Sequence, residues 1–142
     1  LVASASYGNP QRNVTGFDLR RLQMLLAVLE RRAGFQLGTQ DVFINVVSGL
    51  KIAEPAADLG VAIAIISSLK NRVIDAGALI IGEVGLGGEV RNVGQIRRRV
   101  EEAKKLGFNR IILPYGEHKG LTDLGLSIVP VRSLSAAVDE LF

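Results

Sequence analysis

The segment Leu50–Ser68 constrains the fold more than any other part of the sequence. Its start is polar and holds three charged residues, Lys51, Glu54 and Asp58. Pro55 then suits the first turn of a helix, where its missing N–H costs nothing. The rest is an almost wholly apolar run of small and branched residues, and a helix that is apolar on every side is normally buried. We therefore expect Pro55–Lys70 to form a central helix with a polar mouth at its start.

The composition around this segment favours one domain with an aliphatic core. A chain of 142 residues suits a single domain. Apolar residues make up 48% of it, which excludes disorder as the main state. Aromatic residues make up only 5%, so the core must be aliphatic. The net charge of +3 allows an acidic partner such as a nucleic acid without requiring one.

Cellular context follows from two absences in the sequence. There is no cysteine, so disulfides and thiol chemistry are excluded, and a cytoplasmic location is expected. No apolar run approaches the roughly 18 residues of a membrane span, so no membrane partner is expected. The first residues, Leu1-Val2-Ala3, lack an initiator Met and resemble the end of a strand. We therefore expect a domain excised from a longer protein.

The periodicity of apolar residues predicts four helices between four or five strands, and so an α+β fold of mixed α/β layers. The first helix is expected over Leu19–Ala33, with Asp18 as its N-cap and Gly34 as a left-handed cap at its end. Further helices are expected at Pro55–Lys70, at Gln95–Leu106 and from a Ser133 cap to Leu141. Strands are expected at Asp41–Ser48, Ala78–Val84, Glu89–Arg91, Arg110–Leu113 and Ser127–Val131. Irregular structure is expected for most of Leu1–Gly16, after a strand end, and for Tyr115–Leu126.

Several catalytic motifs are absent from the sequence. It has no phosphate-cradling G-x-x-x-x-G-K-[ST] loop and no G-x-S-x-G elbow. The glycines after Val84 fail the dinucleotide pattern, because Val90 stands at the third glycine position. The single histidine, His118, has no cysteine and few partners nearby, so we expect a solvated loop residue and no metal site.

Polar residues beside the apolar runs leave two interpretations open. Glu54 and Asp58 lie four residues apart and could share the helix start for acid–base chemistry. A helix N-terminus also stabilises carboxylates without catalysis, and this interpretation is favoured. Asn45, the one polar residue inside its strand, is expected to face solvent.

A series of short motifs resembles the proteolytic domain of the Lon family. The series consists of Glu54–Asp58, Ile81–Val84, Gly88–Val90 and Gly94–Arg97. In the Lon family a Pro-Ser-Ala-Gly motif carries the nucleophilic serine at the start of a helix, and a Gly-Gly-[Leu/Val]-Lys motif supplies a lysine base. The resemblance implies a Lon proteolytic-domain-like fold, with Ala56 at the serine position and Arg97 at the lysine position. Alanine has no nucleophile and arginine is effectively never deprotonated, so this degenerate dyad predicts a domain without peptidase activity.

Four longer segments narrow the resemblance to the C-terminal Lon-like domain of the RadA (Sms) family of bacterial DNA repair proteins. These segments are Tyr7–Arg12, Gly16–Asp18, Leu26–Arg32 and Lys51–Leu59. The resemblance implies that residues 1–142 are a single Lon protease-like domain, excised from a protein that also has a zinc finger and a RecA-like ATPase core. ATP, magnesium and zinc are then expected in those other domains, and no cofactor is expected in this one.

The same resemblance implies what the whole protein does. It would be a hexameric, DNA-dependent ATPase that promotes branch migration in homologous recombination and DNA repair, with a recombinase filament as a candidate partner. The Lon-like domain would serve as a scaffold of the ring and contribute to DNA binding.

Basic residues support the DNA-contacting part of this expectation. The candidates are Arg97, Arg98, Arg99, Lys104 and Lys105 on one predicted helix, together with Lys51 and Arg91. Lys and Arg neutralise phosphates without reading sequence, so binding is expected to be sequence-independent, and no aromatic platform accompanies the helix. An ordinary solvated face, balanced by Glu101 and Glu102, is the alternative. For the whole domain, an active Lon-type serine peptidase, opposed by Ala56 and Arg97, and a pure ring-assembly module stay open as alternatives.

Overall fold

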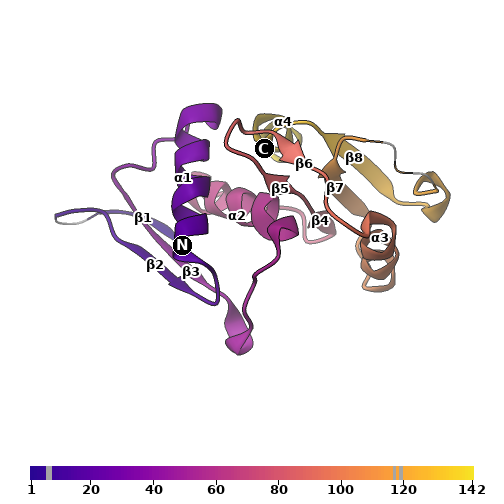
Figure 1. Ribbon diagram of the computed structural model, residues 1–142, viewed down its shortest axis with the longest axis horizontal. Helices are drawn as coiled ribbons and strands as arrows, with labels where there is room; N and C mark the ends of the chain where they lie inside the picture. The colour runs from indigo at the N-terminus through magenta and orange to yellow at the C-terminus, as the bar shows by residue number, and fades with distance from the viewer. Residues whose placement is uncertain (6–7, 117, 119) are drawn as a thin grey trace.

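The computed structural model describes residues 1–5, 8–116, 118 and 120–142 (Figure 1). Its α-helices are α1 (Leu19–Ala33), α2 (Asp58–Lys70), α3 (Ile96–Lys105) and α4 (Leu134–Leu141). Its strands are β1 (Val2–Ser4), β2 (Arg12–Thr15), β3 (Gln40–Asn45), β4 (Ala78–Ile80), β5 (Glu83–Val84), β6 (Val90–Arg91), β7 (Arg110–Pro114) and β8 (Ser127–Val131). Short 3-10 turns lie at Val47–Gly49, Pro55–Ala57 and Thr122–Leu124. Helices and sheets are mixed, so the expected α+β fold class is confirmed.

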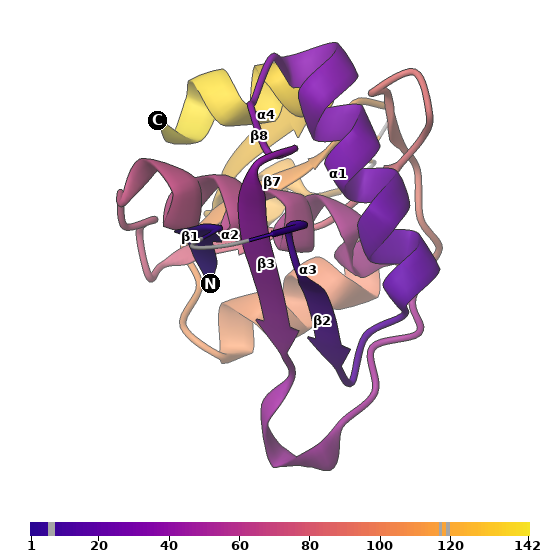
Figure 2. The same cartoon turned by 90° about the vertical axis from the view of Figure 1, so that its left-hand side faces the viewer.

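Two three-stranded sheets flank the central helix α2 (Figure 1). In the first, β3 lies between β1, which is antiparallel to it, and β2, which is parallel to it. Figure 2 shows this sheet facing the viewer, with α2 behind it and α1 alongside. In the second, the parallel strands follow the order β4-β7-β8. The small β5-β6 hairpin joins this second layer, because the Val90 N–H donates to the Arg132 carbonyl at 2.9 Å.

The predicted central helix is confirmed by the burial of α2. Its residues Leu59, Ala62, Ile63 and Ile66 are completely buried, and they pack in a cluster with the stripe of α1 formed by Leu22, Leu25 and Leu29. A second, smaller cluster lies under α3, where Val100 and Ala103 pack with Ile111, Leu113 and Ala56. The start of α2 therefore lies between the two apolar clusters.

Three helix caps expected from the sequence are confirmed. The Asp18 carboxylate accepts from the Arg21 N–H at 2.8 Å at the start of α1. Gly34 ends α1 with a φ of 73°. Ser133 accepts from the Ala136 N–H at 3.1 Å at the start of α4.

Three element predictions were wrong. The strand expected to reach Ser48 ends at Asn45, because Ser48 turns the chain with a φ of 64°. The expected strand Ala78–Val84 is two strands in different sheets. It breaks at Gly82, whose N–H donates to the Ala56 carbonyl and whose carbonyl accepts from the Leu59 N–H, at 2.9 and 3.0 Å. The expected irregular lead-in contains β2, which is held by parallel pairing with β3.

Candidate functional site

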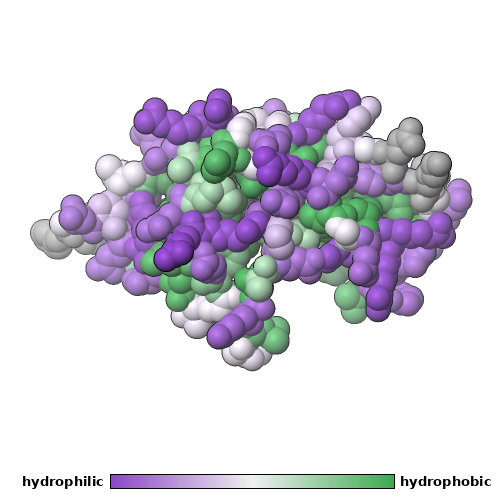
Figure 3. Space-filling view, in the orientation of Figure 1, coloured by the Kyte–Doolittle hydropathy of each residue, from purple (hydrophilic) through white to green (hydrophobic). Residues whose placement is uncertain are grey.

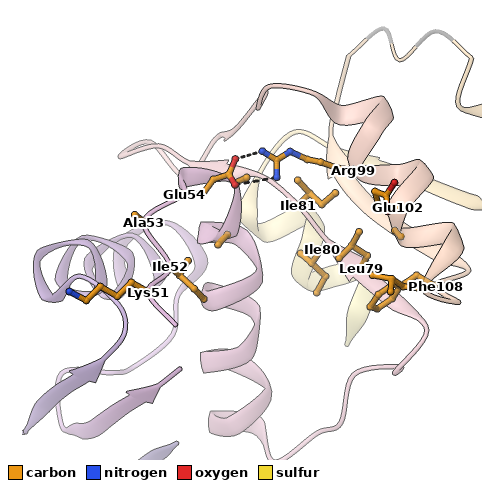
Figure 4. A pocket seen from close by; sticks show the side chains of 14 residues that line it. Lys51, Ile52, Ala53, Glu54, Leu79, Ile80, Ile81, Arg99, Glu102 and Phe108 are labelled. Carbon is orange, nitrogen blue, oxygen red and sulfur yellow. Dashed lines mark hydrogen bonds and ion pairs between the residues drawn. The ribbon is translucent and has the colours of Figure 1, made fainter. Parts of the chain in front are cut away.

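A groove with a volume of about 520 Å³ lies beside Ala56 (Figure 4). Ala56 lies in the 3-10 turn before α2 and is 6% exposed. The groove runs between this turn, β4 and α3, and in Figure 3 the outline of the molecule is indented between the projecting segment 46–53 and α3. Its walls are formed by Ile52, Ala57, Leu79, Ile80, Ile81, Ala103, Leu106 and Phe108.

Polar side chains stand at the rim of this groove. Glu54 accepts two hydrogen bonds from the guanidinium of Arg99, one of them at 3.3 Å (Figure 4). Arg99 also donates through Nε to the Gly94 carbonyl at 2.9 Å, so it is held from both sides. Lys51 and Glu102 complete the polar rim, but the ammonium of Lys51 points away from Arg99 (Figure 4).

The chemistry of the described lining residues is apolar and ionic. None of those lining side chains carries a hydroxyl, a thiol or an imidazole. Arg97 does not line the groove. It donates to Glu101 at 2.8 Å and lies against Gly120, whose Cβ, if present, would be 2.6 Å from Arg97 Nη1. The structure therefore does not bring Arg97 into the groove that Ala56 lines.

The position of Asp58 differs from the expected polar start of the central helix. Its side chain is completely buried, although the sequence placed it at the entrance with Glu54. Both its oxygens accept from Arg21 of α1, and Oδ2 also accepts from the Val84 N–H at 3.2 Å. The hydrogen bond with Asp58 raises the pKa of Arg21 above its ordinary value. Glu54 and Asp58 thus have separate partners, and the arrangement is structural.

Arg21 is a site residue that the sequence analysis missed. It lies on α1, 37 positions before Asp58 in the sequence. No local pattern distinguishes it from Arg20 beside it. A signal was available only on the other side of the pair, since a buried carboxylate at the start of a largely apolar helix needs a partner.

Most of the seven DNA-binding candidates are ion-paired. On α3, Arg97 pairs with Glu101 and Lys105 pairs with Glu102 at 2.8 and 2.7 Å. Two further pairs are Arg99–Glu54 and Arg91–Glu89. Within the described ranges, no ion pair involves Arg98, Lys104 or Lys51. These three candidates have charge left for a phosphate. Arg98 and Lys104 lie on α3, whose five basic and two acidic residues leave it strongly positive, and Lys51 lies at the groove rim.

Two single-residue expectations had different outcomes. Asn45 is exposed, as expected. His118 is half-buried, with Nε2 2.6 Å from the Pro114 carbonyl oxygen, so the expectation of a merely solvated side chain was wrong. Its neighbours Glu117 and Lys119 lie outside the described residues.

Neither metal ligation nor membrane insertion has support in the part of the chain that the structure describes. There, no three His, Asp or Glu side chains gather as a metal site would require. The described helices are too short or too polar to cross a bilayer.

Comparisons with known proteins show clear relatives. A family model described as subunit ChlI of Mg-chelatase matches residues 7–117. The chain is 44% identical over 138 residues to the DNA repair protein RadA of Synechocystis, and the match covers 97% of this chain and 27% of that relative. It is 51% identical over 121 residues to RadA of Chlamydia pneumoniae, covering 85% of this chain and 27% of the relative. It is 46% identical over 142 residues to RadA of Pseudomonas aeruginosa, covering 100% of this chain and 31% of the relative.

These relatives confirm the resemblance to the RadA family, and the chain spans less than a third of their length. The Lon-like label for the fold stays a prediction. The match over residues 7–117 covers most of the chain, so the chain belongs to the family whose model is described as subunit ChlI of Mg-chelatase, with RadA proteins among its relatives.

Proposed function

We propose that the chain is a Lon-like domain without peptidase activity, which serves as a scaffold and a DNA contact in a DNA repair protein. The observation that carries the proposal is the groove beside Ala56. It keeps the shape of a site at a helix start, but its described lining has no hydroxyl, thiol or imidazole, and Arg97 lies outside it. The name of the relatives supports the role in DNA repair.

The rest of the proposal concerns the longer protein. We infer that it is a RecA-like, DNA-dependent ATPase of the cytoplasm, which assembles into a hexameric ring and promotes branch migration in homologous recombination. ATP, magnesium and zinc belong to its other domains, and a recombinase filament is a candidate partner. The ion-paired state of four basic candidates favours the scaffold role of this domain, and leaves Arg98, Lys104 and Lys51 as its phosphate contacts.

A peptidase assay tests the first half of the proposal. The chain is incubated with casein and with a fluorogenic peptide, and no turnover above background is expected. Arg99→Ala at the groove rim is the control, because turnover that belongs to the groove would change in this variant while that of a contaminant would not. Turnover that depends on Arg99 would revive the active Lon-type peptidase.

DNA binding tests the second half. Labelled duplex DNA is titrated with the chain, and weak binding that falls steeply with salt is expected, because counterions are released from the phosphates. Arg98→Ala/Lys104→Ala should weaken binding and reduce the salt slope by about two. Arg20→Ala/Arg31→Ala removes the same charge from exposed positions of α1 and should have the smaller effect. Equal effects of the two double variants would reject α3 as the contact.

Light scattering of the chain addresses the remaining alternative. Self-association together with no duplex binding at low salt would leave a pure assembly module. A monomer that binds duplex DNA would mean that the other domains drive assembly of the ring.

A further inference from the structure

An exposed aromatic side chain lies stacked against an arginine at the carboxyl ends of two parallel strands. Tyr115 directly follows β7 and is 51% exposed. Arg132 directly follows β8 and is also exposed. The guanidinium carbon of Arg132 lies 3.3 Å from the centroid of the Tyr115 ring. Neighbouring strands thus present an aromatic ring and a cation in contact at one edge of the sheet.

The backbone holds this pair in place. The Tyr115 N–H donates to the Val131 carbonyl at 2.8 Å, which continues the register of β7 and β8 beyond their ends. The Arg132 carbonyl accepts from the Val90 N–H at 2.9 Å on the other side. Both residues therefore stand on main chain that is hydrogen-bonded to neighbouring strands. A binding surface that is organised before the ligand arrives loses less entropy on binding.

Polar side chains border the pair. The amide of Asn92 lies beside Gly116, where an added Cβ would be 3.3 Å from Nδ2. Arg97 lies against Gly120 of the same β7–β8 connection. Within the described residues, Arg132 has no carboxylate partner. We call the surface formed by Tyr115, Arg132 and Asn92 the tyrosine ledge.

The chemistry of the ledge fits an unpaired nucleotide. A nucleobase stacks on an aromatic ring whatever its sequence, and a guanidinium next to the ring offers planar N–H donors for a phosphate. In a duplex the faces of the bases are covered by their neighbours, so a ring fixed on a protein surface cannot reach them. A surface cation–π contact that only stabilises the fold is the alternative, and it predicts no effect on binding.

We propose that the tyrosine ledge binds single-stranded DNA by stacking one base on Tyr115 and contacting the adjoining phosphate through Arg132. This inference rests on the proposed function, since that function supplies DNA as the ligand. It also changes the expectation that no aromatic platform accompanies the basic residues. Arg97 of the basic helix lies against Gly120, in the connection that Tyr115 begins.

Fluorescence anisotropy with two probes tests the ledge. The probes are an oligothymidylate of about 16 nucleotides, the upper end of single-strand site sizes, and a duplex of the same length. Tyr115→Ala should weaken binding of the single strand about tenfold, because one base–ring stack is lost, and should leave duplex binding unchanged. Tyr115→Phe keeps the ring and should bind as the wild type does. Leu86→Ala changes an apolar side chain that is 74% exposed elsewhere, and is the matched control.

Tyrosine fluorescence keeps the inference testable even if the Tyr115→Ala variant fails to fold. The chain has two tyrosines and no tryptophan, so in a Tyr7→Phe background the tyrosine fluorescence reports on Tyr115 alone. Quenching on addition of the oligothymidylate is expected, because the base stacks on the ring. Absence of quenching at saturating oligonucleotide would overturn the inference.

The outcomes separate this inference from the proposed function. A chain that binds duplex DNA through Arg98 and Lys104, but whose single-strand affinity is the same in Tyr115→Ala, overturns the ledge and leaves the function standing. A chain that binds neither probe overturns both. Equal losses on the two probes in Tyr115→Ala would show a general defect and reject the stacking role.

Discussion

Asp58 and Gln95 are unusual for their positions at helix starts, Asp58 because it is buried and Gln95 because of its left-handed backbone. Asp58 begins α2 as a buried carboxylate, and Arg21 and the Val84 N–H provide its hydrogen bonds. Gln95 precedes α3 in the left-handed region, with a φ of 59°, although its side chain makes no capping hydrogen bond. A single substitution at each residue measures how much it changes the free energy of unfolding.

Replacing Asp58 by Asn should destabilise the chain by about 3 kcal/mol, because the substitution leaves Arg21 without its counter-charge. The measurement is the free energy of unfolding from urea titration followed by circular dichroism. Asp139→Asn, an exposed position on α4, is the matched control and should change the free energy of unfolding by less than about 0.5 kcal/mol. An Asp58→Asn variant as stable as this control would show that the pair contributes nothing.

Replacing Gln95 by Gly should stabilise the chain by about 0.5 kcal/mol. Glycine relieves the left-handed strain of about 1–2 kcal/mol, and part of this gain is offset by the greater freedom of the unfolded chain. Gln36 is exposed and does not have a positive φ, so Gln36→Gly should instead be destabilising. The two variants are compared by urea unfolding, and destabilisation by both would contradict the strain argument.

At the level of whole elements, α2 shows how a helix of small residues can be surrounded by other elements. Its start is tied to β5 and to the break at Gly82, and its apolar residues contact both α1 and the strands. Gly60 stands where α2 passes β4, and a Cβ added there would be 3.5 Å from the Ile80 carbonyl oxygen, an ordinary contact. The close approach of β4 therefore does not require glycine.

Gly60→Ala should stabilise the chain by about 0.5 kcal/mol, because alanine is the better helix former and the space for a methyl group is present. Gly16→Ala is the contrasting substitution. Gly16 has a φ of 73°, and its Cβ would collide with the Leu50 carbonyl oxygen and approach Val46 Cβ to 2.7 Å. The thermal midpoint should rise for the first variant and fall for the second. A fall for both would mean that α2 and β4 cannot separate by even a small amount.

Among the described residues, several acidic and basic side chains are paired at the surface, and two of these pairs lower the pKa of a glutamate. Glu89 has a pKa below its ordinary value of 4.5, chiefly through the hydrogen bond of its own backbone N–H and then through Arg91. Glu102 has a pKa below 4.5 because it accepts from Lys105. The same pair raises the pKa of Lys105 above 10.5, so the lysine stays charged throughout the acidic range.

The free energy of unfolding should therefore decrease as the pH is lowered through the acidic range. A carboxylate whose pKa is lowered by folding contributes fully above its unfolded pKa, and the contribution is lost as the pH falls through the folded pKa. The Glu89→Gln/Glu102→Gln variant should show a flatter dependence between about pH 5 and pH 3. Urea unfolding at several pH values measures both slopes, and identical slopes would show that these two pairs are not coupled to folding.

Much of the local structure could be predicted from the sequence. The stripe on α1, the caps Asp18, Gly34 and Ser133, and the apolar run of α2 all act within one or two turns of chain. The strand predictions were weaker, because a strand ends where its partner ends. The break at Gly82 and the pairing of β2 with β3 depend on segments far away in the sequence.

The candidate site shows the same division between local and distant interactions. The unreactive side chain of Ala56 and the basic character of α3 are properties of residue types, so they could be recognised from the sequence without knowing the fold. The residues with which these side chains pair could not be recognised from the sequence. Arg21 meets Asp58 across 37 positions, Arg99 meets Glu54 across 45, and Tyr115 meets Arg132 only because β7 and β8 are parallel neighbours. Side-chain identity defines which charges and rings a chain has, whereas packing of distant segments decides which of them are neutralised, buried or left facing solvent.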